Sequence, residues 1–86
     1  MHHHWDFFGP DAEKTAKHFE KHILEFARQE NLQFDASGIF HADEHHTGYW
    51  VETSCDSDSE KIKKRLRPRR SLSAEEHHQL LSELKS

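Results

Sequence analysis

The segment Ala12–Glu30 places the strongest constraint on the fold. Its apolar residues recur with the spacing of one stripe on a helix of 3.6 residues per turn, at Ala16, Phe19, Ile23 and Phe26. A helix of this length gains most of its stability by packing its apolar side on another element. We therefore expect an amphipathic helix docked on a surface that the rest of the chain supplies.

Three segments have the composition of strands. Residues 3–8 alternate around Trp5 and Phe7, and Gly9-Pro10 ends the run. Residues 38–42 and 48–53 are rich in β-branched and aromatic residues and flank a polar turn, which predicts a hairpin. We expect Tyr49 and Val51 to share the inward face.

The C-terminal part of the chain predicts a helix in two pieces. Ser57 with Glu60, and Ser73 with Glu76, have the spacing of capping boxes, and Pro68 separates the two pieces. The first piece carries Ile62 and Leu66, and the second has a stripe of four residues: His77, Leu80, Leu81 and Leu84.

This order predicts a single α+β domain over residues 1–86, with a core in about 3–54 and a basic and helical segment in 55–86. A right-handed crossover followed by a hairpin gives a β-α-β-β-α fold: a split β-α-β, truncated ferredoxin-like arrangement. Its three-stranded antiparallel or mixed sheet has the order 1-3-2 and helices on one face. The missing fourth strand would leave residues 3–8 as an open edge, which predicts homodimerisation there.

Composition narrows the function classes. No apolar run approaches the roughly 20 residues of a membrane span, and Cys55 has no partner for an intramolecular disulfide, so we expect a cytoplasmic protein without membrane contact. A nucleophile elbow, a glycine-rich phosphate loop and an isolated carboxylate pair are all missing from the sequence. We therefore expect no enzymatic activity.

Histidine is unusually abundant, at ten residues. The densest group is the turn that contains His41, Asp43, His45 and His46, whose nitrogen and oxygen atoms suit zinc or nickel; no other cofactor is expected. His2–His4 fit both a native strand and a truncated purification tag. His18 and His22 are spaced to chelate a metal together, but they also fit positions that flank the buried stripe.

A basic run is the clearest sign of a partner. Residues 61–70 hold seven cations and no acid, in a chain whose formal net charge is −4. Such a run contacts phosphates in many proteins, but it lacks aromatic residues that stack on bases, and it also fits neutralisation of the acidic remainder. The candidate contacts are Lys61, Lys63, Lys64, Arg65, Arg67, Arg69 and Arg70.

The sequence therefore favours a non-enzymatic protein-interaction or regulatory module that self-associates or binds another protein. A thin core over one face of a sheet cannot bury every strand aromatic, which makes Trp5, Phe8, Phe40 and Trp50 candidate anchors. Two alternatives stay open. One is a metal-binding or metal-responsive protein that uses the histidine-rich turn, and the other is an RNA-associated accessory protein that uses residues 61–70.

Overall fold

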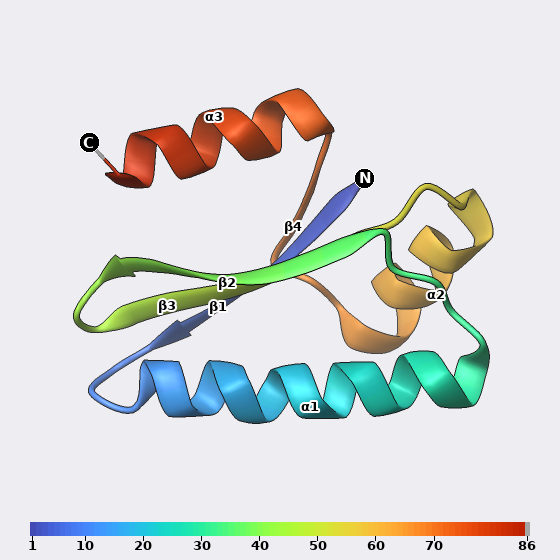
Figure 1. Ribbon diagram of the computed structural model, residues 1–86, viewed down its shortest axis with the longest axis horizontal. Coiled ribbons are helices and arrows are strands. Elements are labelled where there is room, and N and C mark those ends of the chain that lie inside the picture. Colours follow the sequence, from blue (N-terminus) through green and yellow to red (C-terminus); the bar gives the residue numbers. More distant parts are fainter. Residues whose placement is uncertain (86) are drawn as a thin grey trace.

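The computed structural model describes residues 1–85, with side chains as far as residue 83. It contains a four-stranded sheet and three helices (Figure 1). The elements are β1 (His2–Phe8), α1 (Ala12–Glu30), β2 (Ala36–Asp43), β3 (His46–Glu52), α2 (Asp56–Leu66), β4 (Arg70–Leu72) and α3 (Ala74–Lys85). All strand pairs are antiparallel and the spatial order is β2-β3-β1-β4. The α+β class predicted from the sequence is confirmed.

Helix α1 has the bounds that its apolar periodicity predicts. It ends where Asn31 adopts the left-handed conformation at φ 55° and the amide of Leu32 donates to the carbonyl of Ala27 at 2.8 Å. Its buried stripe includes Ala16 and Ile23, which are 0% and 1% exposed. The pattern of the sequence and the packing of the helix therefore agree.

The apolar core lies between the sheet and the layer formed by α1 and α2, below the sheet in Figure 1. Because strand side chains alternate between faces, Trp5 of β1 and Tyr49 and Val51 of β3 point into this core together. Ile23 of α1 and Ile62 of α2 complete its centre. The inward placement predicted for Tyr49 and Val51 is confirmed.

The prediction that all helices lie on one face is wrong, because α3 covers the opposite face of the sheet (Figure 1). The reciprocal capping box predicted for this helix is present, with the amides of Ser73 and Glu76 each bonded to the other side chain at 3.2 Å. His77 of the predicted stripe is 2% exposed against the sheet. The side chain of Leu84 lies outside the described part of the chain.

The prediction of three strands is also wrong, because β4 pairs with β1. His2, His3 and His4 align with Leu72, Ser71 and Arg70. The edge expected to mediate dimerisation is therefore covered over these three residues. Along residues 1–85, the full-length strand that has a neighbour on one side only is β2.

Two glycines allow aromatic rings to lie flat on the α3 face of the sheet. A Cβ atom at Gly38 would come within 2.9 Å of the Trp50 indole, and one at Gly48 would overlap the Phe40 ring. Each glycine is thus covered by an aromatic residue of the neighbouring strand. This close approach buries Phe40 and Gly48 together.

We expect Gly48→Ala to lower the free energy of unfolding by about 1–3 kcal/mol, because the added methyl group must displace the Phe40 ring from a packed position. Urea denaturation measures the difference. Ser54→Ala, an exposed loop substitution, is the control and should change stability by less than about 0.5 kcal/mol. A Gly48→Ala protein as stable as the wild type would show that the ring is not held against this glycine.

Candidate functional site

Three imidazoles form a buried cluster between the sheet and α3. His2 and His4 project from β1 on the face opposite Trp5, and His77 meets them from the first turns of α3. The His4 Nε2 and His77 Nδ1 atoms are 2.9 Å apart, and the His2 and His77 rings stack with centroids 3.9 Å apart. None of the three residues is more than 3% exposed. We call this group the histidine cluster.

The walls of the histidine cluster combine an aromatic ring with a carboxylate. The Trp50 ring centroid lies 4.5 Å from that of His77, in an edge-on arrangement. A Glu52 carboxylate oxygen lies 2.7 Å from His2 Nε2. Trp50 and Glu52 both lie on β3, the neighbour of β1. The antiparallel register sets Glu52 opposite His2 and Trp50 opposite His4.

Burial keeps the histidine cluster uncharged near neutral pH. It lowers the pKa of His4 and of His77 to about 4, and neighbouring positive groups add to the effect. The pKa of His2 is also lowered by burial, although Glu52 opposes this change. The Nδ1 atoms of His2 and His4 have no hydrogen-bond partner in the described structure, which fits neutral rings protonated at Nε2.

His3 points to the other face and is held by hydroxyl groups. Its Nδ1 lies 2.8 Å from the Ser71 hydroxyl, and its Nε2 lies 3.2 Å from that of Ser59. Burial lowers the pKa of His3 to about 4, with Lys63 and the N-terminus contributing. His2–His4 are therefore integral parts of the sheet, as the reading of a native strand requires.

The residues of the predicted metal site do not converge. Asp43 accepts the backbone amide of His45 at 2.7 Å, and His46 contacts Asp6 at 3.0 Å. His41 lies 3.4 Å from the Thr47 hydroxyl on the opposite face of the sheet from His46. Across residues 1–85, no group of three or more His, Cys, Asp or Glu side chains is arranged to hold a metal ion.

The four predicted anchors fall into different environments. Trp5 is 6% exposed and donates its indole N–H to the Leu66 carbonyl at 3.1 Å, and Phe40 is 9% exposed. These two residues belong to the interior because α1, α2 and the Phe40–Gly48 contact cover them, so the expectation that they are exposed is corrected. Trp50 is half-buried, whereas Phe8 is 66% exposed and stacks on His46.

Part of the predicted basic surface is neutralised internally. The Asp6 side chain is 1% exposed, and Arg70, Arg69 and His46 surround it at 2.8, 3.4 and 3.0 Å. These contacts tie the chain around β4 to β1.

Two more cations of the basic run lie near acids: Lys63 is 3.9 Å from Glu60, and Arg65 is 3.9 Å from Glu30. Lys61, Lys64 and Arg67 are exposed, and none of the ion pairs found within residues 1–83 includes them. The run is therefore divided between internal ion pairs and a smaller exposed set.

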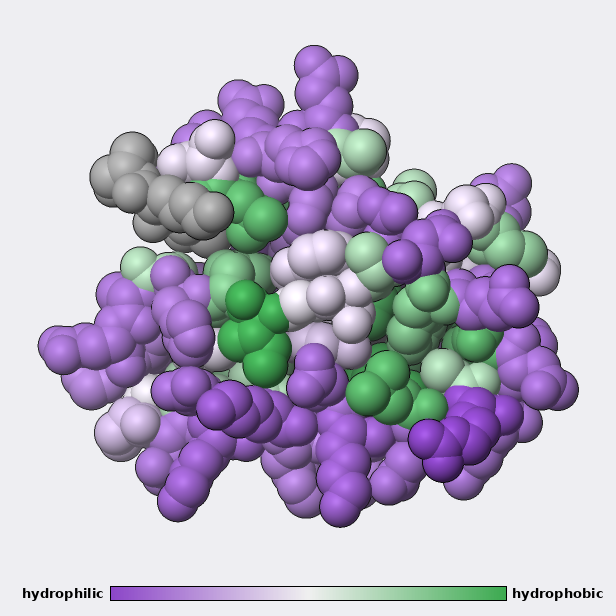
Figure 2. Space-filling view, in the orientation of Figure 1, coloured by the Kyte–Doolittle hydropathy of each residue, from purple (hydrophilic) through white to green (hydrophobic). Residues whose placement is uncertain are grey.

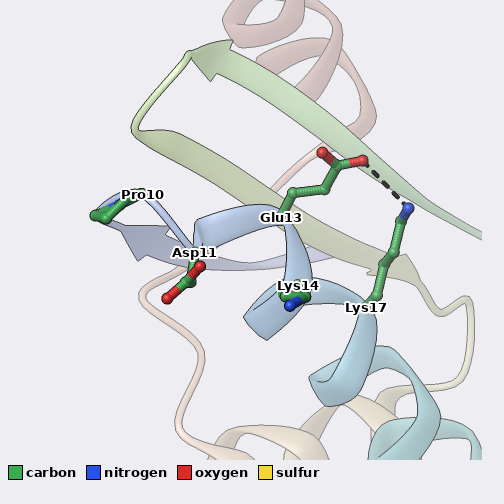
Figure 3. Close-up of a pocket in the computed structure, with 5 residues that line it drawn as sticks. All are labelled: Pro10, Asp11, Glu13, Lys14 and Lys17. Atoms are coloured by element: carbon green, nitrogen blue, oxygen red, sulfur yellow. Dashed lines mark ion pairs between the residues drawn. The ribbon is translucent and has the colours of Figure 1, made fainter.

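The hollow shown in Figure 3 lies at the start of α1 and has a volume of about 270 Å³. It is lined by Pro10, Asp11, Glu13, Lys14 and Lys17, and an ion pair at 3.2 Å joins Glu13 to Lys17 across it. Its lining is charged and exposed, unlike the mostly apolar walls of small-molecule sites. This hollow offers no buried polar group to orient a ligand.

The open edge of β2 forms a different kind of surface. Residues 36–42 contain no Asp, Glu, Lys or Arg, in a chain where such residues make up 33%. Figure 2 shows hydrophobic residues across the middle of this view, at the level of β2 and between β2 and α1, with hydrophilic residues along the outer side of α1. We call residues 36–42 with their outward backbone groups the β2 edge.

Comparison of the chain with protein-family models, with curated proteins and with solved structures gave no match. Among the described residues, no helix is long and apolar enough to cross a membrane.

The buried histidines should make stability depend strongly on pH. The unfolded chain takes up protons near pH 6.5, whereas folded His3, His4 and His77 resist protonation until about pH 4. The unfolded state therefore binds more protons in this window, and the free energy of unfolding should fall by several kcal/mol between these values. Urea denaturation at a series of pH values measures the slope.

Two variants assign the slope to the buried rings. His77→Gln removes one of these groups and should flatten the pH dependence. His45→Gln removes an exposed histidine and should leave the wild-type slope unchanged. Equal slopes in all three proteins would contradict the assignment.

Proposed function

We propose that the protein is a non-enzymatic interaction module that associates with a second copy of itself through the β2 edge. The observation that carries the proposal is an edge strand in which residues 36–42 include no Asp, Glu, Lys or Arg. Proteins usually protect such strands with lysine, proline, short length or a covering segment. In β2 the irregularity between His41 and Asp43 is confined to one end.

The β2 edge is chemically self-complementary. In an antiparallel pair of identical strands, centring the two-fold axis on Ile39 sets this residue opposite its copy. The same register sets Gly38 opposite Phe40 and Ser37 opposite His41. Within residues 36–42 no pair brings two like charges together. Beyond them, the same register sets Asp43, the last residue of β2, opposite Asp35 of the second copy.

Apolar side chains beside the β2 edge add area to this interface. Ile39 is partly buried on the α1 face, and Leu24 of α1 is 45% exposed. Leu24 lies on the flank of α1 away from α2, because α2 contacts the opposite flank through Arg65 over Phe26 at 5.7 Å. A second copy at the β2 edge would bring its own Leu24 to the same side of the joined sheet.

We also propose that the fold is ferredoxin-like, with α3 as an addition. The order β-α-β-β-α-β and the strand order β2-β3-β1-β4 support this assignment. With β1 covered by β4 and one sheet face covered by α3, the β2 edge is the part of the sheet most available to a partner. The fold thus leaves the surface that the proposed function requires.

The double variant Ser37→Lys/His41→Lys tests the proposal. In the proposed register these positions face each other across the axis, so each dimer would contain two like-charged pairs. We expect the dissociation constant to rise roughly 10-fold or more, as measured by sedimentation equilibrium. Gln29→Lys/Gln79→Lys adds the same charge at exposed helical positions and should leave association unchanged.

Charge reversal provides the rescue. Mixing the lysine double variant with Ser37→Asp/His41→Asp should restore association as a heterodimer, because opposite charges then face each other. A wild-type protein that stays monomeric at high micromolar concentration would overturn the proposal. So would a dimer that tolerates the lysine double variant.

A further inference from the structure

We infer that His18 and His22 on α1 form a binding site for a divalent late first-row transition metal ion, of the copper(II) or nickel(II) class. Both side chains are exposed, and their Nε2 atoms face each other 3.0 Å apart across one helical turn. The inference does not depend on the proposed self-association, because the site lies on the helix surface and not on the sheet edge.

The separation of the two nitrogens suits a chelate. Metal–imidazole bonds are about 2.0–2.1 Å long, so two such bonds at a right angle hold their nitrogens about 2.9 Å apart. Adjacent positions of square-planar or octahedral ions meet at this angle, as in copper(II) and nickel(II) sites. The pair therefore has the required nitrogen separation before any metal binds, and water would complete the coordination.

Glu25 occupies the position of a supporting carboxylate. The 3.0 Å contact is a hydrogen bond in which one Nε2 atom donates to the other. A metal ion that replaces this hydrogen bond binds both Nε2 atoms, so both rings must then carry their protons on Nδ1. The His22 Nδ1 atom lies 3.9 Å from the Glu25 carboxylate, so a small shift of this exposed side chain would let it accept a hydrogen bond from that proton and strengthen the ligand.

The charge around the pair limits the affinity. Lys14 precedes His18 by four residues and Lys21 follows it by three, so two cations flank the site on the helix surface. Two protein ligands with Glu25 as support therefore make a modest, exchangeable site.

This site differs from the other histidine groups of the protein. In the histidine cluster, His4 and His77 are buried and bonded to each other, so these nitrogen atoms are not exposed to metal ions in solution. In the turn at residues 41–46, His41 and His46 project from opposite faces of the sheet. His18 and His22 alone combine exposure with two nitrogens at chelating distance among the described histidines.

Titration of the full-length protein with nickel(II) chloride at about pH 7.5, where imidazole ligands are mostly unprotonated, tests the inference. We expect paramagnetic broadening of amide NMR signals at substoichiometric nickel to centre on the helical turn around His18 and His22. His18→Gln should weaken binding roughly 100-fold, because the chelate becomes a single ligand. Glu25→Gln should weaken it up to about 10-fold.

His45→Gln is the matched control, because it removes one exposed histidine and leaves the pair intact. Its nickel affinity should equal that of the wild type. Circular dichroism of each variant checks that α1 stays folded. Broadening centred on residues 41–46 or on the N-terminus, or an affinity that His18→Gln leaves unchanged, would overturn the inference.

Discussion

The position of β1 at the centre of the sheet is the constraint on which the rest of the structure depends. It pairs with β3 along its whole length and with β4 at His2–His4, and its alternating side chains serve both faces. Trp5 packs in the apolar core between the sheet and α1, while His2 and His4 pack against α3. A shift of one residue in its register would exchange the apolar and the imidazole faces, so both layers fix the same alignment.

Local patterns predicted the elements whose stability is decided locally. The apolar stripe gave α1 its bounds, and the spacing of Ser73 and Glu76 gave the start of α3, because periodicity and capping depend on residues within a few turns. Strand β4 could not be predicted this way. Arg70–Leu72 has no strand signal of its own and is extended because it pairs with His2–His4, about 68 residues earlier in the chain.

The candidate sites also differ in whether local sequence or distant packing determines them. The alternation of His2 and His4, together with the place of His77 in the stripe of α3, was the available signal for the histidine cluster. This signal predicts a cluster only when α3 lies on the face of the sheet opposite α1 and α2. The expectation of all helices on one face excluded that arrangement. The turn at residues 41–46 is dense in histidine, but adjacent residues of a strand point to opposite faces of the sheet, so their side chains rarely converge on one metal ion.

Charge placement explains why a chain with so small an apolar fraction still holds three layers together. The acidic N-terminal part and the basic run meet at Asp6, where Arg69 and Arg70 reach a carboxylate that is 1% exposed. Near neutral pH the histidine cluster contributes neutral, stackable rings under α3 where an apolar core would otherwise be needed. Ion pairs to Asp6 thus hold the β4 edge of the sheet, and uncharged imidazoles fill the contact between the sheet and α3. The β2 edge, which has neither, is the surface at which we propose that a second copy adds its strand to the sheet.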